Sequence, residues 1–195
     1  MKLVVSGLLA LCVFVFFDAP TITGLYDMPA VTNTTLYLVG YSQELYDKRY
    51  RCINTTYEGR QHHWVQRNLY VTYNFSGLTN NSWYVPIEVR NLSNNFYLEV
   101  NQTPILKGLF RLRKKYLIWD FDNNSLVLSE RIQSIRNLTP PCSLWVTRDH
   151  INLTTVPSRA NYTFFTFCSN PMFIGYNDSC FGVNENNKIT CKRPQ

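Results

Sequence analysis

The sequence predicts a mainly β, antiparallel fold that closes as a barrel or packs as a sandwich. Short stretches of alternating apolar and polar residues recur along the chain, with turn residues between them. Aromatic residues make up 15% of the chain and charged residues only 16%, which is typical of a packed domain and not of a disordered chain. A length of 195 residues indicates one domain rather than two.

The expected strands are short. The period-two pattern marks residues 35–41, 50–57, 65–73, 83–90, 96–100, 109–113, 116–121, 126–132 and 145–147. Pro86 cannot donate to a strand ladder, so it predicts a bulge or an edge in the fourth run. The turn residues Asp122, Asn123 and Asn124 predict a hairpin between the runs 116–121 and 126–132. Only residues 160–167 are expected to be helical.

The N-terminus predicts a signal peptide. Lys2 precedes an apolar run over residues 3–17, which is short for a membrane span. We expect a leader over residues 1–19, with cleavage between 19 and 24, and a single mature domain over 20–195. An uncleaved anchor is the alternative. No other run is apolar enough to cross a bilayer, so no membrane partner is expected after the leader is removed.

Eleven Asn-x-Ser/Thr tripeptides support secretion as a glycoprotein, because glycans need loops or outward faces. They lie at Asn33, Asn54, Asn74, Asn80, Asn91, Asn101, Asn123, Asn137, Asn152, Asn161 and Asn177.

Signals for catalysis or metal binding are weak. His62 and His63 are adjacent and would point to opposite faces of a strand, so they would chelate one metal poorly. No phosphate loop, nucleophile elbow or Cys-His signature is present. The sequence therefore predicts a protein that is not an enzyme and that has no metal site and no cofactor.

The net charge of +6 is compatible with nucleic acid, anionic membranes or anionic ligands. Most basic residues are scattered along the sequence, so no nucleic-acid partner is expected. One cluster, Arg111, Arg113, Lys114 and Lys115, fits a solvated hairpin turn or a basic ring around the mouth of a barrel.

Three further charged residues are candidates for a ligand site. Arg67 shares a strand face with Val65 and Leu69. If that face is interior, the arginine needs an anionic partner; the alternative is that the face is exterior. Asp120 and Asp122 alternate onto one face and could form a cation site, or could mark a solvated strand end before the turn.

The order of motifs in the C-terminal third resembles that of the tick salivary lipocalins, the histamine-binding protein family. The motifs are Cys142-Ser143-Leu144-Trp145-Val146, Val156-Pro157, an aromatic run from Tyr162 to Cys168, and Tyr176-x-x-x-Cys180. The stretch Leu36-Tyr37-Leu38-Val39, then Tyr50-Arg51-Cys52, and the hairpin from Tyr116 to Leu128 are similar too. The resemblance implies an eight-stranded antiparallel lipocalin-like barrel with a short C-terminal helix, secreted in saliva, expected as a monomer.

The resemblance also implies the disulfide pairing. Cys12 leaves with the leader, so five cysteines remain. By similarity Cys142 pairs with Cys168 and Cys52 pairs with Cys180, which leaves Cys191 spare. Cys191 is the rival partner of Cys52.

Two functions follow from the resemblance. In the first, the barrel sequesters a small host mediator, either a lipid such as a leukotriene or fatty acid, or an amine such as histamine or serotonin, to suppress inflammation or haemostasis. In the second, the outer surface blocks a host protein such as a complement component. The expected ligand-binding residues are Arg67, Trp83, Trp119, Asp120, Phe121, Asp122 and Trp145.

Two motifs favour a lipid over histamine. The amine binders of the family resemble Cys-Asp followed by Glu-Leu-Trp, in which the acidic residues meet a protonated amine. Here Ser125-Leu126 and Ser143-Leu144-Trp145 stand in those places. A buried ammonium without a carboxylate partner is strongly disfavoured.

Overall fold

The computed structural model describes residues 27–73, 81–92, 96–130, 139–176 and 180. The predicted leader, Cys191 and four of the predicted glycosylation sites lie outside these residues; the four sites are Asn74, Asn80, Asn137 and Asn177. In the part that is described, no helix is long and apolar enough to cross a membrane.

The described chain forms β-strands with short helices between them. The strands are β1 (Leu36–Ser42), β2 (Tyr50–Gln61), β3 (Trp64–Tyr73), β4 (Asn81–Leu92), β5 (Tyr97–Val100), β6 (Lys115–Phe121), β7 (Ser125–Glu130), β8 (Cys142–Val146) and β9 (Pro171–Phe173). The helices are η1 (Pro29–Val31), η2 (Gln43–Leu45), α1 (Pro104–Leu109), η3 (Arg148–His150) and α2 (Ser158–Phe167).

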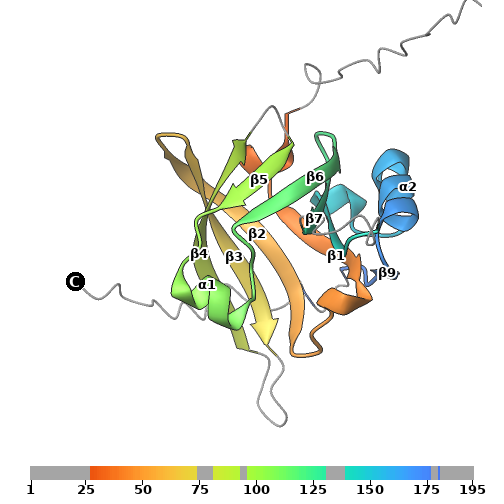
Figure 1. Ribbon diagram of the computed structural model, residues 1–195, viewed down its shortest axis with the longest axis horizontal. Coiled ribbons are helices and arrows are strands. Elements are labelled where there is room, and N and C mark those ends of the chain that lie inside the picture. The colour runs from red at the N-terminus through yellow and green to blue at the C-terminus, as the bar shows by residue number, and fades with distance from the viewer. Residues whose placement is uncertain (1–26, 74–80, 93–95, 131–138, 177–179, 181–195) are drawn as a thin grey trace, which may run out of the picture.

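Strands β1 to β8 close into an antiparallel barrel (Figure 1). Each strand pairs with the next along the chain, and β1 pairs with both β2 and β8, which completes the ring. Strand β9 pairs with β1 near the end of that strand, beyond the eight of the barrel. The predicted eight-stranded barrel and the C-terminal helix are therefore confirmed.

One predicted strand is wrong. Residues 109–113 end helix α1 and continue into the connection to β6. The sequence does contain a helix start there: Thr103 accepts a hydrogen bond from the Leu106 amide at 3.3 Å, and Pro104 occupies the first turn. Pro86 behaves as an edge residue, because β4 pairs with β5 only from Val89 onward.

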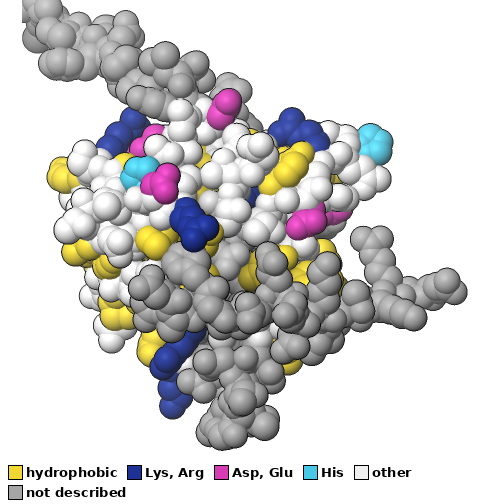
Figure 2. Space-filling view, turned by 180° about the vertical axis from the view of Figure 1, so that it is seen from behind, with side chains coloured by type: hydrophobic (Ala, Val, Ile, Leu, Met, Phe, Trp, Pro, Cys, Tyr) yellow, Lys and Arg dark blue, Asp and Glu magenta, His cyan; other side chains and the backbone are white. Residues whose placement is uncertain are grey.

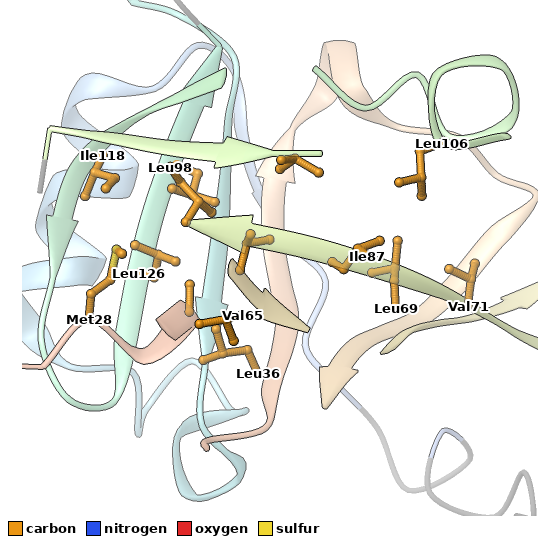
Figure 3. Close-up of a cluster of buried hydrophobic side chains, with 14 residues drawn as sticks. Met28, Leu36, Val65, Leu69, Val71, Ile87, Leu98, Leu106, Ile118 and Leu126 are labelled. Carbon is orange, nitrogen blue, oxygen red and sulfur yellow. The ribbon is translucent and has the colours of Figure 1, made fainter. Parts of the chain in front are cut away.

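The interior of the barrel is one apolar cluster (Figure 3). Alternate residues of β3 and β4 face it, and so do residues of β5, β6 and β7. Met28 and Ala30, from η1 and the residue before it, close one end of the cluster, and Leu106 of α1 packs at the other. We call these the η1 end and the α1 end of the barrel.

A second apolar cluster lies between the outer face of the barrel and α2. Phe164 of α2 is fully buried there beside Val127 and Leu144. Gly40 of β1 permits this approach, because a Cβ at that position would stand 2.9 Å from the Phe164 ring. The helix therefore packs against the barrel wall and does not enter the barrel.

Two disulfides fasten the C-terminal segment to the barrel. Cys142 of β8 bonds to Cys168 at the end of α2, and Cys52 of β2 bonds to Cys180. The Tyr176 hydroxyl donates to the Cys52 carbonyl oxygen at 3.1 Å and accepts from the Asn54 amide at 2.8 Å. The structure therefore joins Cys52 to Cys180, as the resemblance implied.

Candidate ligand-binding site in the barrel

Strands β3 and β4 provide the clearest view of the barrel lining. Their ladder is unbroken, so Leu69 stands opposite Val85 and Arg67 opposite Ile87, all on the inner face. Val71 stands opposite Trp83, which places Trp83 on the same face at the α1 end. The lining is therefore aliphatic along most of its length, as expected of a site for an apolar ligand.

Aromatic side chains complete the lining. Tyr50, Tyr57, Phe121 and Trp145 pack against the interior cluster but remain only partly buried. The Trp145 indole nitrogen donates to the Ser143 hydroxyl at 2.9 Å, so its polar edge has a partner. Large rings with a satisfied polar edge provide flat apolar walls for a ligand.

Arg67 is the charged residue of the interior, and backbone oxygens surround it. Only 1% of its surface is exposed. Its guanidinium donates to the carbonyl oxygens of Ala30 at 3.2 Å and Thr32 at 3.0 Å, and also to that of Thr34. Thr55 accepts through its hydroxyl and its carbonyl oxygen, both at 3.1 Å. These acceptors take the place of the anionic partner expected from the sequence.

Burial lowers the pKa of Arg67 to about 10, so the guanidinium stays charged at neutral pH. Because the N–H groups of Arg67 already donate to these oxygens, few of them remain to bind a ligand. Arg67 therefore holds the η1 segment against the inner face of the barrel.

Asp120 lies on the outer face of the barrel, not in the interior. The β6–β7 ladder shifts register between Ile118 and Asp120, which breaks the expected alternation. As a result Asp120 stands opposite Val127, beneath α2, and its carboxylate lies 2.6 Å from the Arg159 guanidinium. Burial raises the pKa of Asp120, and the Arg159 charge partly opposes that rise.

The other predicted site residues are divided between the two faces. Trp119 is on the outer face: its ring stacks on Phe167 at 5.6 Å, and its indole nitrogen donates to the Ser129 hydroxyl. Asp122 holds the β6–β7 turn, accepting from the Asn124 amide at 2.7 Å and the Ser125 hydroxyl at 2.9 Å. The structure thus brings Arg67, Phe121 and Trp145 to the interior, leaves Trp83 at the α1 end, and keeps Trp119, Asp120 and Asp122 out.

Sequence reasoning missed the residues that close the two ends. Met28 and Ala30 precede the first predicted strand, and Leu106 with Phe110 belongs to the segment around α1. The Thr103-Pro104 start was a usable signal for α1. No local pattern indicated that Met28 faces the interior, because its place depends on the contact of Arg67 with η1.

The relatives of this chain support the same architecture. No family model matches the sequence. Japanin-like-RS from Rhipicephalus sanguineus is 28% identical over 162 residues, covering 82% of this chain and 87% of that protein. Japanin from Rhipicephalus appendiculatus is 27% identical over 168 residues, covering 81% of this chain and 86% of that protein. A crystal structure of Japanin bound to cholesterol matches with a TM-score of 0.72 at 27% identity, over 79% of this chain and 99% of that one.

The fold is that of a lipocalin. Lobster apocrustacyanin A1 shares it with a TM-score of 0.52 at 10% identity, over 75% of this chain and 78% of that one, which supports the fold alone. The Japanins place the similarity of this chain with tick proteins of that fold. They do not single out the histamine-binding branch that the sequence motifs suggested. The Japanin structure contains bound cholesterol, so that relative is a ligand-binding protein.

Proposed function

We propose that this lipocalin is secreted in saliva and sequesters one small lipid of the host inside its barrel. The apolar lining carries this proposal. Its described inward residues are mostly aliphatic and aromatic, with Asn91 among the polar ones, and the charge of Arg67 is already engaged by backbone oxygens. An apolar ligand gains about 25 cal/mol for each Å² that it buries against such walls.

The same lining disfavours histamine and serotonin. Both carry an ammonium group at neutral pH, and a buried ammonium needs a carboxylate partner. Neither predicted aspartate provides one, since Asp120 contacts Arg159 under α2 and Asp122 belongs to a turn. Glu130, opposite Tyr116 at the end of β7, is already paired with Arg113. A lipid therefore fits the barrel better than an amine.

Among lipids, a neutral one is favoured over a fatty acid or a leukotriene. The Arg67 donors are occupied, so a carboxylate at the η1 end would find no charge partner there. An anionic lipid would have to keep its headgroup at the α1 end, beside Lys107 and Arg111. The related Japanin was crystallised bound to cholesterol, which agrees with a neutral ligand of sterol size.

Binding can be tested with two tryptophan variants of one strand. Val85 faces the interior and its neighbour Tyr84 faces outward beside Tyr70. Val85→Trp adds volume inside the barrel without adding charge, whereas Tyr84→Trp adds similar bulk outside. We expect V85W to lower the affinity for a fluorescent sterol by roughly tenfold or more, and Y84W to leave it unchanged.

The ligand panel should include the sterol, arachidonate, a cysteinyl leukotriene, histamine and serotonin. Mass spectrometry of the protein secreted by insect cells would also identify any lipid that stays bound through purification. Submicromolar histamine binding without lipid binding would contradict the proposal. Equal effects of V85W and Y84W would show that the ligand does not enter the barrel.

One observation favours the alternative, an outer surface that binds a host protein. Helix α2 exposes Tyr162, Phe165 and Phe167, with 63%, 43% and 39% of their surfaces accessible. Exposed aromatic side chains are enriched where proteins meet. Suppose that none of the five small molecules binds, and that the protein binds a host protein. If Tyr162→Ser and Phe165→Ser variants lose that binding, the outer-surface function becomes the better account.

A further inference from the structure

The charges of this lipocalin are segregated in space. Residues 43–51 and 104–115 hold eight basic residues and two acidic ones, whereas the rest of the described chain holds five arginines and eight carboxylates. The basic residues are Lys48, Arg49, Arg51, Lys107, Arg111, Arg113, Lys114 and Lys115, and the acidic ones are Glu44 and Asp47. Figure 2 shows acidic side chains only in the upper half of that view, whereas basic side chains occur both there and at its lower end.

The fold brings the two basic segments together at the α1 end. The Tyr50 ring lies 5.5 Å from the Phe110 ring, between the start of β2 and the residues after α1. Arg111 is close enough to contribute to the low pKa of the Asp47 carboxyl. Both segments lie at the lower end of the molecule in Figure 1. Residues far apart in sequence thus form one basic surface.

The carboxylates in this surface are already engaged. Asp47 accepts from the Arg49 guanidinium at 2.9 Å, and Glu44 accepts from the Asn170 amide at 2.9 Å. Glu130, at the end of β7, accepts from Arg113 at 2.9 Å. Lys48, Lys107 and Arg111 are exposed beside them, so the surface presents positive charge to solvent.

Apolar side chains are exposed at the same end. Ile105 of α1 is 52% accessible and Trp83 of β4 is 46% accessible. Leu45 and Tyr46, after β1, are 39% and 53% accessible. Tryptophan and tyrosine are enriched where proteins meet the headgroup region of a bilayer. Lysine side chains can reach over such apolar residues to the phosphates.

We infer that the α1 end is a docking surface for an anionic phospholipid membrane. The basic side chains are attracted to the negative surface potential of such a membrane, and the exposed apolar residues add contact with the acyl boundary. A soluble polyanion such as heparin would use the basic residues but would leave Ile105 and Trp83 without a role. This inference rests on the proposed function, because a membrane is where a lipid of low solubility resides.

Vesicle sedimentation tests the inference directly. The full secreted protein is mixed with vesicles of phosphatidylcholine alone or with about one third phosphatidylserine, at about 50 mM and about 500 mM salt. We expect binding only to the anionic vesicles, with loss at the higher salt. The double variant Lys48→Glu/Lys107→Glu should lower partitioning by roughly tenfold or more, and Ile105→Ser should lower it several-fold.

Two controls separate docking from folding and from ligand binding. Ile174→Ser changes an equally exposed apolar residue in the segment after α2, and should leave vesicle binding unchanged. Sterol delivered from cyclodextrin should still bind K48E/K107E, whereas sterol uptake from anionic vesicles should be slowed. If the wild-type protein does not bind sterol delivered from cyclodextrin, the proposed function is refuted instead of the docking surface.

Three results would overturn the inference that the α1 end docks on an anionic membrane. These are equal binding to neutral and anionic vesicles, equal losses in I105S and I174S, and binding to heparin beads without binding to vesicles. Melting temperatures of all variants close to that of the wild type would show that each one is folded.

Discussion

At the scale of single residues, buried charge decides what the barrel can hold. Arg67 is compatible with an apolar interior because its guanidinium donates hydrogen bonds to the carbonyl oxygens of Ala30, Thr32, Thr34 and Thr55. A hydrogen bond to a charged group contributes about 1.5–3 kcal/mol, and a buried acceptor left without a donor costs about as much. The N-terminal segment and Arg67 therefore stabilise each other.

Replacing Arg67 by methionine should lower the free energy of unfolding by about 3 kcal/mol, because several buried carbonyls lose their donor. Arg60→Met is the matched control, since the exposed Arg60 donates to the carbonyl of Val31 in the same segment. We expect less than about 1 kcal/mol there. Urea denaturation measures both, and equal losses would show that the buried network does not stabilise the fold.

Two aspartates should give opposite pH dependences. Burial raises the pKa of Asp120 above its ordinary value of 3.8, so the stability linked to its protonation is present below pH 3.8 and is lost as the pH rises through the folded-state pKa. Hydrogen bonds from Arg49 lower the pKa of Asp47 to about 2, so its contribution is present above pH 3.8 and is lost as the pH falls towards 2.

The corresponding asparagine variants separate these effects. Relative to the wild type, Asp120→Asn should remove a decline in stability above pH 4, and Asp47→Asn should remove part of the decline below pH 4. Urea unfolding at a series of pH values provides the measurement. If the free energy of unfolding changes with pH in the same way in both variants, the two carboxylates do not have the different environments described above.

At the scale of elements, covalent links hold the C-terminal segment on the barrel. The Cys52–Cys180 bond spans 128 residues and the Cys142–Cys168 bond spans 26. Loop-closure entropy in the unfolded chain grows with the logarithm of the span, so the longer link should stabilise more. Tyr176 adds two hydrogen bonds next to Cys52.

The double variant Cys52→Ala/Cys180→Ala should lose about 5 kcal/mol of unfolding free energy, against about 3.5 kcal/mol for Cys142→Ala/Cys168→Ala. Chemical denaturation of the two purified proteins compares them. Peptide mapping of the wild type under non-reducing conditions checks the pairing itself. A bond between Cys52 and Cys191 would contradict the arrangement.

The strands and loops also predict which sequons carry glycans. Asn33, Asn101, Asn123 and Asn152 are exposed. Asn91 stands opposite Leu98 on the inner face, and the Asn54 amide donates to Tyr176. Glycans need an outward, accessible position, so we expect occupancy at the four exposed sites and none at Asn54 and Asn91. Mass spectrometry of peptides from the secreted protein tests this, and a glycan on Asn91 would be incompatible with the folded barrel.

At the scale of the whole molecule, the strands β1 to β8 surround the candidate site, so ligand binding should stabilise the entire fold. A ligand that binds only the folded state adds about 2.7 kcal/mol at a hundredfold excess over its Kd. We expect sterol to raise the melting temperature of the wild type by several degrees and histamine to leave it unchanged. If histamine but not sterol raises the melting temperature, the barrel prefers an amine to a lipid.

The alternation along the chain predicted an antiparallel β-fold, either a barrel or a sandwich, and the resemblance selected the eight-stranded barrel. Alternating residues in β1 to β4 and the Asp122–Asn124 turn specify strands and a hairpin locally, and a strand with one apolar face must bury it. The side-chain period of two also placed Arg67 on the same face as Val65 and Leu69. The cysteine order, through the resemblance, predicted both disulfides that the structure contains.

Which candidates line the site depended on contacts between segments that are distant in the sequence. The register shift after Ile118 moved Asp120 outward beneath α2, and no local pattern encodes which strand of a pair accommodates an extra residue. Three acceptors of Arg67, the carbonyl oxygens of Ala30, Thr32 and Thr34, come from a segment more than thirty residues earlier in the chain. Basic residues that look scattered in sequence meet at the α1 end because barrel closure brings the β1–β2 and β5–β6 connections together. Alternation is a property of neighbours along the chain, whereas these three outcomes depend on contacts made across it.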